Sequence, residues 1–167
     1  MGTDKFLKLG TSGFEEVTTI DSSAGAGDVG KIPSLDSSGK IDNSFLPAGI
    51  GGETLSIEAS EALSAGDLVN LHESTGVKVR KADNTNNRPA HGFVLDAITS
   101  AASGSVYFEG ACTGLTGMTI GAQQWLGATG AVTEIIPTTA GYIAQSVGRA
   151  VSATQLSFEP SDPITRV

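Results

Sequence analysis

The segment Gly25–Lys31 has the glycine spacing of a nucleotide-binding loop. It contains a Gly-x-Gly-x-x-Gly run followed by a lysine, the residue that contacts phosphate oxygens in such loops. A phosphate-binding loop needs Ser or Thr after the lysine to hold Mg²⁺, whereas here Ile32 follows, and Pro33 stands where a helix should begin. A chain with 22 glycines matches such patterns by chance. We therefore interpret the segment as part of a flexible arm and predict no cofactor.

Residues capable of acid–base or metal chemistry are few and dispersed. His72 and His91 are the only histidines, and neither has a second ligand at helical spacing. His72 adjoins Glu73, but adjacent side chains on a strand point to opposite faces. Asp96 and Glu109 would form a carboxylate pair if their strands were neighbours, but nothing in the sequence fixes their separation. We predict no catalytic residue and no metal ligand, and hence that the chain is not an enzyme.

The single cysteine, Cys112, excludes an intramolecular disulfide and a cysteine-based metal site. No basic residue lies near it in sequence to activate the thiol, so we expect a small buried side chain. The aromatic residues lie in strand-like patterns and are predicted to belong to the core or to a subunit contact.

The charge balance limits the partners of the chain. It carries 18 acidic and 10 basic residues, a net charge of −8, and the basic residues are scattered. Nucleic-acid binding requires a basic patch, so we predict no nucleic-acid partner, and an anionic membrane surface is equally disfavoured. The first nine residues contain no apolar run and no 18 consecutive residues are apolar, so we expect neither a signal peptide nor a membrane span.

Short apolar stretches separated by glycine predict an all-β chain, an antiparallel β-barrel or sandwich. Glu73–Gly76 and Ala128–Gly130 are predicted hairpin turns. We expect at most one short helix, at Glu58–Leu63. The expected strands are 14–20, 55–59, 67–71, 77–80, 92–98, 105–110, 124–126, 131–135, 142–151 and 155–159.

The composition of the sequence changes at Pro47–Gly52, where proline and glycine interrupt any regular element. We predict an extended N-terminal arm and linker over residues 1–52 and a β-barrel or sandwich domain over 53–167 with a short C-terminal tail. The arm repeats Gly-Lys-Ile at Gly30–Ile32 and Gly39–Ile41, each copy a turn followed by an extended piece. It lacks a core of its own, so its apolar residues are the predicted partner contacts: Phe6, Leu7, Leu9, Ile32, Leu35, Ile41, Phe45 and Leu46.

Three stretches, Arg88–Val94, Val106–Gly110 and Leu156–Pro160, resemble the bacteriophage capsid decoration, or cement, proteins that stabilise heads. The Gly-Lys-Ile copies of the arm resemble a linker of phage head and tail-fibre proteins. The resemblance implies a virion structural protein, made in the host cytoplasm, that binds the outside of the assembled capsid and stabilises it by bridging capsomers. The implied partners are the major capsid protein and neighbouring decoration subunits, in a homotrimer. It brings no catalytic residues.

Two other functions remain open from the sequence. In the first alternative the chain is a tail or tail-fibre component whose β-domain attaches to a receptor or to the tail. In the second it is a wall-degrading hydrolase carried on a virion, which would require Asp, Glu or His residues clustered in a cleft.

Overall fold

A computed structural model describes residues 5–35, 39–46 and 53–167, and the chain is all-β as predicted. The chain divides into two compact units, Met1–Gly51 and Gly52–Val167. The segment Pro47–Gly52, where we predicted the boundary, lies outside the described residues. No helix in the described ranges is long and apolar enough to span a membrane.

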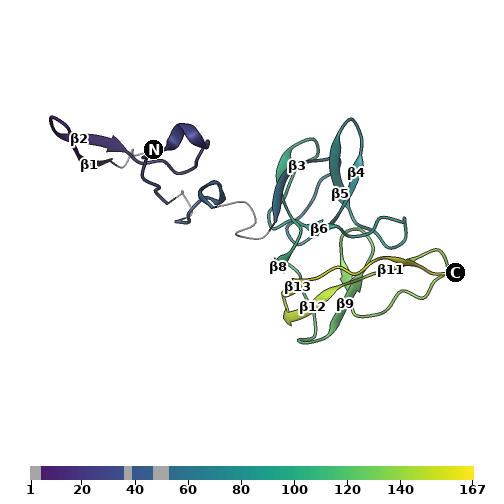
Figure 1. Ribbon diagram of the computed structural model, residues 1–167. Coiled ribbons are helices and arrows are strands. Elements are labelled where there is room, and N and C mark those ends of the chain that lie inside the picture. Colours follow the sequence, from purple (N-terminus) through teal and green to yellow (C-terminus); the bar gives the residue numbers. More distant parts are fainter. Residues whose placement is uncertain (1–4, 36–38, 47–52) are drawn as a thin grey trace. The chain divides into compact units, whose positions relative to one another are not determined.

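Over residues 5–35 and 39–46, the N-terminal unit forms one hairpin and two short 3-10 helices (Figure 1). Strand β1 (Lys5–Gly10) pairs antiparallel with β2 (Gly13–Thr18) in a two-stranded sheet. The 3-10 helices are η1 (Ala26–Asp28) and η2 (Asn43–Phe45). An isolated parallel bridge joins Ile20, which precedes η1, to Pro33, which follows it. The pairing of β1 with β2 was not predicted, since the sequence indicated only the second strand.

The C-terminal unit begins with a closed five-stranded barrel, which confirms the barrel alternative. Its strands neighbour one another in the order β3-β5-β4-β6-β7. They are β3 (Thr54–Ala59), β4 (Leu68–Glu73), β5 (Val77–Lys81), β6 (Gly92–Phe93) and β7 (Ser103–Tyr107). The pair β3 and β5 is parallel, whereas the others are antiparallel, so the barrel departs from the fully antiparallel prediction.

A second, five-stranded antiparallel sheet follows the barrel in the chain, in the order β10-β9-β12-β13-β8. Figure 1 shows β9, β12 and β13 side by side in this sheet. Its strands are β8 (Gly110–Thr113), β9 (Gln123–Leu126), β10 (Val132–Thr133), β12 (Ser146–Ser152) and β13 (Gln155–Phe158). A last small pair joins β11 (Ile143–Ala144) to β14 (Ile164–Thr165) near the C-terminus.

Two apolar clusters stabilise the C-terminal unit. The first belongs to the barrel and includes Ile57, Val69, Val79 and Val106. The second joins barrel residues such as Leu68 to residues of the other sheet. The second cluster contains Leu68, Ala82, Ala90, Phe93, Cys112, Met118, Leu126, Val147, Ala150, Leu156 and Phe158. Barrel and sheet therefore share a core, as a single domain does.

Both predicted hairpin turns are confirmed. Glu73 opposes Val77 across the first turn, and Thr75 and Gly76 adopt positive φ values of 53° and 109°. Strands β9 and β10 are joined by the second turn, where Thr129 and Gly130 are also left-handed.

The predicted helix at Glu58–Leu63 is wrong. Its first two residues end β3, and Leu63 forms an isolated bridge with Ile98. Strand geometry prevails because Ala59 faces the barrel core and its carbonyl accepts a hydrogen bond from Ala101 N. Tertiary packing thus overrides the local helical tendency. The strand expected at 92–98 is also much shorter, since β6 covers only Gly92–Phe93.

Candidate functional site

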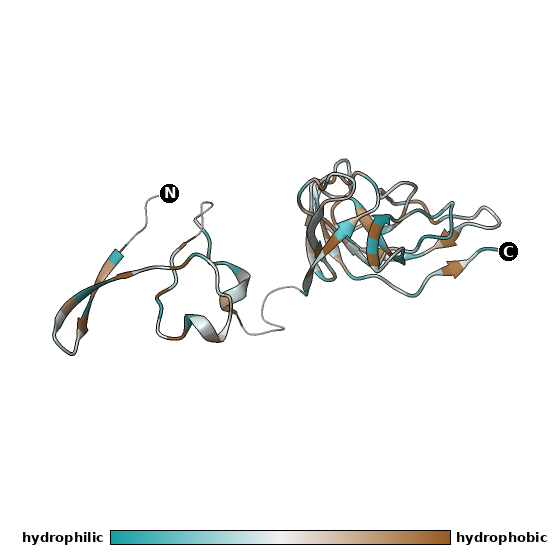
Figure 2. Ribbon diagram, turned by 90° about the horizontal axis from the view of Figure 1, so that it is seen from above, coloured by the Kyte–Doolittle hydropathy of each residue, from teal (hydrophilic) through white to brown (hydrophobic). Residues whose placement is uncertain are grey.

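The apolar residues predicted as partner contacts lie in the N-terminal unit and are largely exposed. On β1, Leu7 and Leu9 are exposed, whereas Phe6 is half-buried opposite Val17. Farther along the unit, four more are exposed and Phe45 is half-buried. The four exposed residues are Ile32, Leu35, Ile41 and Leu46. Figure 2 shows hydrophobic segments, in brown, along this unit. Two further exposed apolar residues, Phe14 and Val29, were not among the predicted contacts.

These side chains do not assemble into a core. Every member of both apolar clusters formed by the described residues belongs to the C-terminal unit. Exposed apolar surface that is concentrated in one part of a chain is typical of a partner-binding segment. Most of the predicted contact residues therefore lie at the surface, and their role as partner contacts stays a prediction.

The two Gly-Lys-Ile copies start in the same backbone conformation. Gly30 has φ 82° and Gly39 has φ 73°, a region that glycine adopts without strain. In the first copy, Ile20 N donates to Ile32 O and Ser34 N donates to Ile20 O, which holds an extended piece against Ile20. The interpretation of this copy as a turn followed by an extended segment is confirmed.

The glycine-rich segment Gly25–Lys31 forms a turn whose polar groups hydrogen-bond to one another. The carboxylate of Asp28 accepts hydrogen bonds from Lys31 Nζ at 2.7 Å and from Ala24 N at 2.6 Å. The hydrogen bond from Lys31 is the main reason that the pKa of Asp28 lies below its usual value. The lysine that would contact a phosphate is thus already paired with a carboxylate of the same loop. This arrangement favours a structural turn over a nucleotide site.

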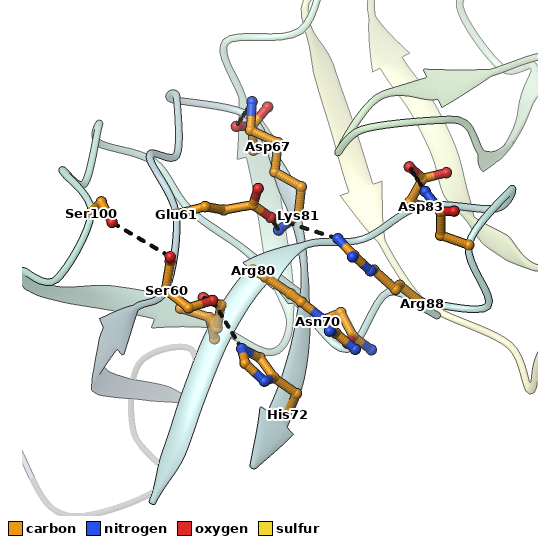
Figure 3. A network of polar contacts seen from close by, with 12 residues as sticks. Ser60, Glu61, Asp67, Asn70, His72, Arg80, Lys81, Asp83, Arg88 and Ser100 are labelled. Atoms are coloured by element: carbon orange, nitrogen blue, oxygen red, sulfur yellow. Dashed lines mark hydrogen bonds and ion pairs between the residues drawn. The ribbon is translucent and has the colours of Figure 1, made fainter. Parts of the chain in front are cut away.

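The outer face of the barrel carries a network of polar contacts (Figure 3). Lys78 Nζ pairs with Glu58 at 2.7 Å across the parallel strands, and Lys81 Nζ lies 3.1 Å from Asp67. Arg80 Nε donates to the amide oxygen of Asn70 at 3.0 Å. Glu61 accepts Lys81 N at 2.8 Å. The cations of this face mostly have carboxylate partners, so the network links strands to one another and does not form a free basic patch.

The close contact between Ser60 and His72 was not foreseen. Ser60 Oγ lies 2.9 Å from His72 Nε2, and the same hydroxyl lies 3.2 Å from Val79 O (Figure 3). A serine nucleophile requires a base that a third group orients and donors that stabilise an oxyanion. Ser60 is exposed and follows the end of β3, whereas His72 is on β4, on the other side of β5. This pair therefore resembles a surface hydrogen bond across β5 more than a catalytic dyad.

The two carboxylates considered for acid–base chemistry, Asp96 and Glu109, are both exposed. No group of three or more His, Cys, Asp or Glu residues gathers within the described ranges. One pocket, of about 310 Å³, is lined by residues of the Gly66, Gly114 and Gly130 turns, most of which are glycine, alanine or apolar residues. Asp67 is the one ionisable residue among its lining residues, and this carboxylate is paired with Lys81.

The polar loop after β5 is organised by Asp83. Its carboxylate accepts hydrogen bonds from Thr85 N at 2.9 Å, Thr85 Oγ1 at 2.8 Å and Asn86 Nδ2 at 3.0 Å. Burial alone would raise the pKa of Asp83, but these hydrogen bonds outweigh it and the pKa is lowered. The loop also hydrogen-bonds to the residue after β9 and to β11, since Asn84 N donates to Gly127 O and Ile143 N donates to Asn84 O. This loop therefore links the barrel to the later part of the C-terminal unit.

Cys112 is fully buried, as predicted. Its Sγ lies 3.7 Å from Gly66 O, and burial, aided by the charge of Asp67, raises its pKa to about 12. The thiolate, which is the reactive form, is therefore strongly disfavoured at neutral pH.

The three stretches that carry the resemblance meet in the shared core. Phe93 stacks on Tyr107 with ring centroids 5.4 Å apart, and its edge meets Phe158 at 5.3 Å. One aromatic residue from each stretch thus contributes to a single cluster between barrel and sheet. These three residues are therefore structural.

Comparison with known proteins identifies little. No family model matches the chain, and no curated protein matches it. Among solved structures, the chain is similar to the N base of the head fibre protein gp8.5 of bacteriophage phi29. The match has 13% sequence identity and a TM-score of 0.44, and it covers 65% of this chain and 95% of the other.

Proposed function

We propose that this chain is a structural protein of a bacteriophage virion that binds the outside of the assembled capsid and stabilises it by bridging capsomers. The observation that carries the proposal is the concentration of exposed apolar side chains in a unit that contributes nothing to either apolar cluster. Such a segment gains most by packing on another protein. The resemblance of the sequence to decoration proteins supplies the kind of partner, the major capsid protein.

Repetition strengthens weak contacts. A capsid presents many identical sites, and a homotrimer that engages several of them binds more tightly than any single arm. The net charge of −8 keeps such an abundant protein soluble and disfavours nucleic acid as the partner. The proposal assigns no catalytic activity and no cofactor to the chain.

A binding experiment with matched variants tests this proposal. Purified protein is mixed with assembled capsids prepared without it, and the bound fraction is measured by co-sedimentation. The arm variant carries I32S, L35S and I41S, and the control carries L55S, V77S and I120S in the C-terminal unit, where all three residues are also exposed. We expect the control to bind like the wild type and the arm variant to lose binding. Equal binding of both variants would contradict the role of the arm.

The alternative function, a tail or tail-fibre component, rests on the same exposed arm. It makes a different prediction in the same experiment, because the protein would then co-sediment with purified tails and not with capsids. The two functions also differ in copy number, which is high for a shell protein and low for a fibre.

A further inference from the structure

The hairpin β1–β2 has an unusual separation of charge between its two strands. All of its cations, Lys5 and Lys8, lie on β1, and all of its anions, Glu15 and Glu16, lie on β2. Within one hairpin these charges already pair, with Lys5 Nζ 2.7 Å from Glu16 and Lys8 Nζ 3.9 Å from Glu15. The hairpin is therefore a ribbon with a basic edge and an acidic edge.

Both edges of this ribbon are open. The hairpin forms a two-stranded sheet with no third strand from the described residues. An isolated hairpin is marginally stable in water, and its unpaired backbone groups are a template for another strand.

One face of the hairpin is apolar toward its tip. The register places Leu9 opposite Phe14 and Leu7 opposite Glu16, so these side chains share a face with Lys5. Leu7, Leu9 and Phe14 are 67%, 72% and 77% exposed. A partner for this hairpin must supply strands that pair with its two open edges. It must also supply apolar side chains that cover its apolar face.

We infer that the hairpin joins copies of this chain edge to edge, with β1 of one copy beside β2 of the next. This pairing places every lysine between glutamate-bearing strands, one from its own hairpin and one from its neighbour. Pairing β1 with β1, or β2 with β2, would align like charges, which destabilises a sheet. The charge pattern thus selects a head-to-tail contact over a symmetric one.

Head-to-tail contacts close into a ring or continue as a filament. Hairpins related by a rotation axis form a ring of alternating β1 and β2 strands. The face bearing Leu7, Leu9 and Phe14 turns inward, with Leu9 and Phe14 packed toward the tip and the Lys5–Glu16 ion pair of the same face toward the other end of the hairpin. The barrel of this same chain closes with five strands. Three hairpins would supply six strands, so the ring that we infer is one of three copies, the number in the proposed homotrimer. This inference rests on the proposed function in one respect, because the hairpin is the element that assembles the proposed homotrimer.

The test uses the purified full chain without capsids. Its mass is measured by sedimentation velocity for the wild type, for L9S/F14S and for the control L55S/I135S, whose residues are comparably exposed in the C-terminal unit. We expect a trimer for the wild type and the control and a smaller species for L9S/F14S.

A charge-swapped variant, K5E/K8E/E15K/E16K, separates edge pairing from other modes of association. It retains opposite charges within the hairpin and between its own copies, so we expect it to form trimers alone. Mixed with isotopically labelled wild type, it should not form mixed trimers by native mass spectrometry, because like-charged edges would meet. Free mixing, or a trimer that survives L9S/F14S, would refute the hairpin inference while leaving a homotrimer intact. A monomeric wild type would refute both.

Discussion

Replacement of Gln145 by a residue of similar volume should strongly lower the free energy of unfolding of the C-terminal unit. The side chain is 2% exposed. Its Oε1 accepts a hydrogen bond from Ala90 N at 2.8 Å, and its Nε2 donates to Ala90 O and to Ser161 O, both at 3.0 Å. It therefore ties the polar loop before β6 to the second sheet and to the C-terminal tail.

The substitution Gln145→Leu keeps a similar volume but leaves both backbone groups of the buried Ala90 without a partner. Each buried polar group left unsatisfied costs about 1–3 kcal/mol, so the two groups together cost roughly 2–6 kcal/mol. Ser161 is exposed, and water can replace the lost donor at its carbonyl. The predicted loss is large against a typical domain stability of about 5–15 kcal/mol.

Urea denaturation, followed by far-UV circular dichroism, measures the free energy of unfolding. Gln155→Leu is the matched control, because Gln155 lies half-buried on β13 and its replacement should change stability by less than about 0.5 kcal/mol. A loss of less than about 1 kcal/mol for Gln145→Leu would refute the reasoning, since the buried groups of Ala90 would then have found other partners.

Three further predictions concern single residues. Gly148→Ala should destabilise the domain by about 3 kcal/mol or more, because the added Cβ would lie 1.8 Å from Ser157 O at a φ of 131°, whereas Gly27→Ala, with no atom within 4 Å, should be nearly neutral by the same urea assay. Desolvation lowers the pKa of His91, whose Nδ1 accepts a hydrogen bond from Leu71 N at 3.0 Å, so the unfolded state takes up the proton first as pH falls. The contribution of His91 to stability is complete above the unfolded-state pKa of about 6.5 and is lost as the pH falls from that value toward the lowered folded-state pKa. H91Q should therefore flatten the fall in unfolding free energy between about pH 7.5 and 5.5. An unchanged slope in H91Q would contradict this prediction. Cys112 should resist a thiol reagent such as DTNB in the native protein and react once urea unfolds it, and rapid labelling of the native state would contradict its burial.

The β-class of the chain and most of its strands could be predicted, because alternation and turn chemistry are local signals. Glu73–Gly76 supplies a loop whose last residue must be left-handed, and the flanking stretches alternate. Strands without such signals were missed. Gly110–Thr113 contains small residues only and forms β8 by pairing with β13, while β14 has just two residues.

The register between distant strands could not be predicted. Ser60 meets His72 because β3 and β5 run parallel, which aligns Glu58 with Lys78 and brings β4 alongside. Short parallel strands that are not consecutive in the chain carry no sequence signal that shows which of their residues align. Similarly, the helical tendency of Glu58–Leu63 gave way to barrel packing.

The partner surface was predicted by an argument from absence of a local core, and this argument depends only on composition. Leu7, Leu9 and Ile32 are exposed, and their role as partner contacts stays a prediction. The hairpin and its charge separation were not predicted, because Lys5–Gly10 does not alternate in a simple apolar–polar pattern. Pairing with β2 was needed to show that the two strands carry opposite charges.

The central claim is that this chain coats the outside of a capsid, and a cryo-EM reconstruction of virions that carry it tests this most directly. We predict density for the chain over the outer shell at three-fold or quasi-three-fold positions, in many copies, with the N-terminal unit contacting neighbouring capsomers. Density confined to the tail, or a few copies at a single fibre site, would contradict the account.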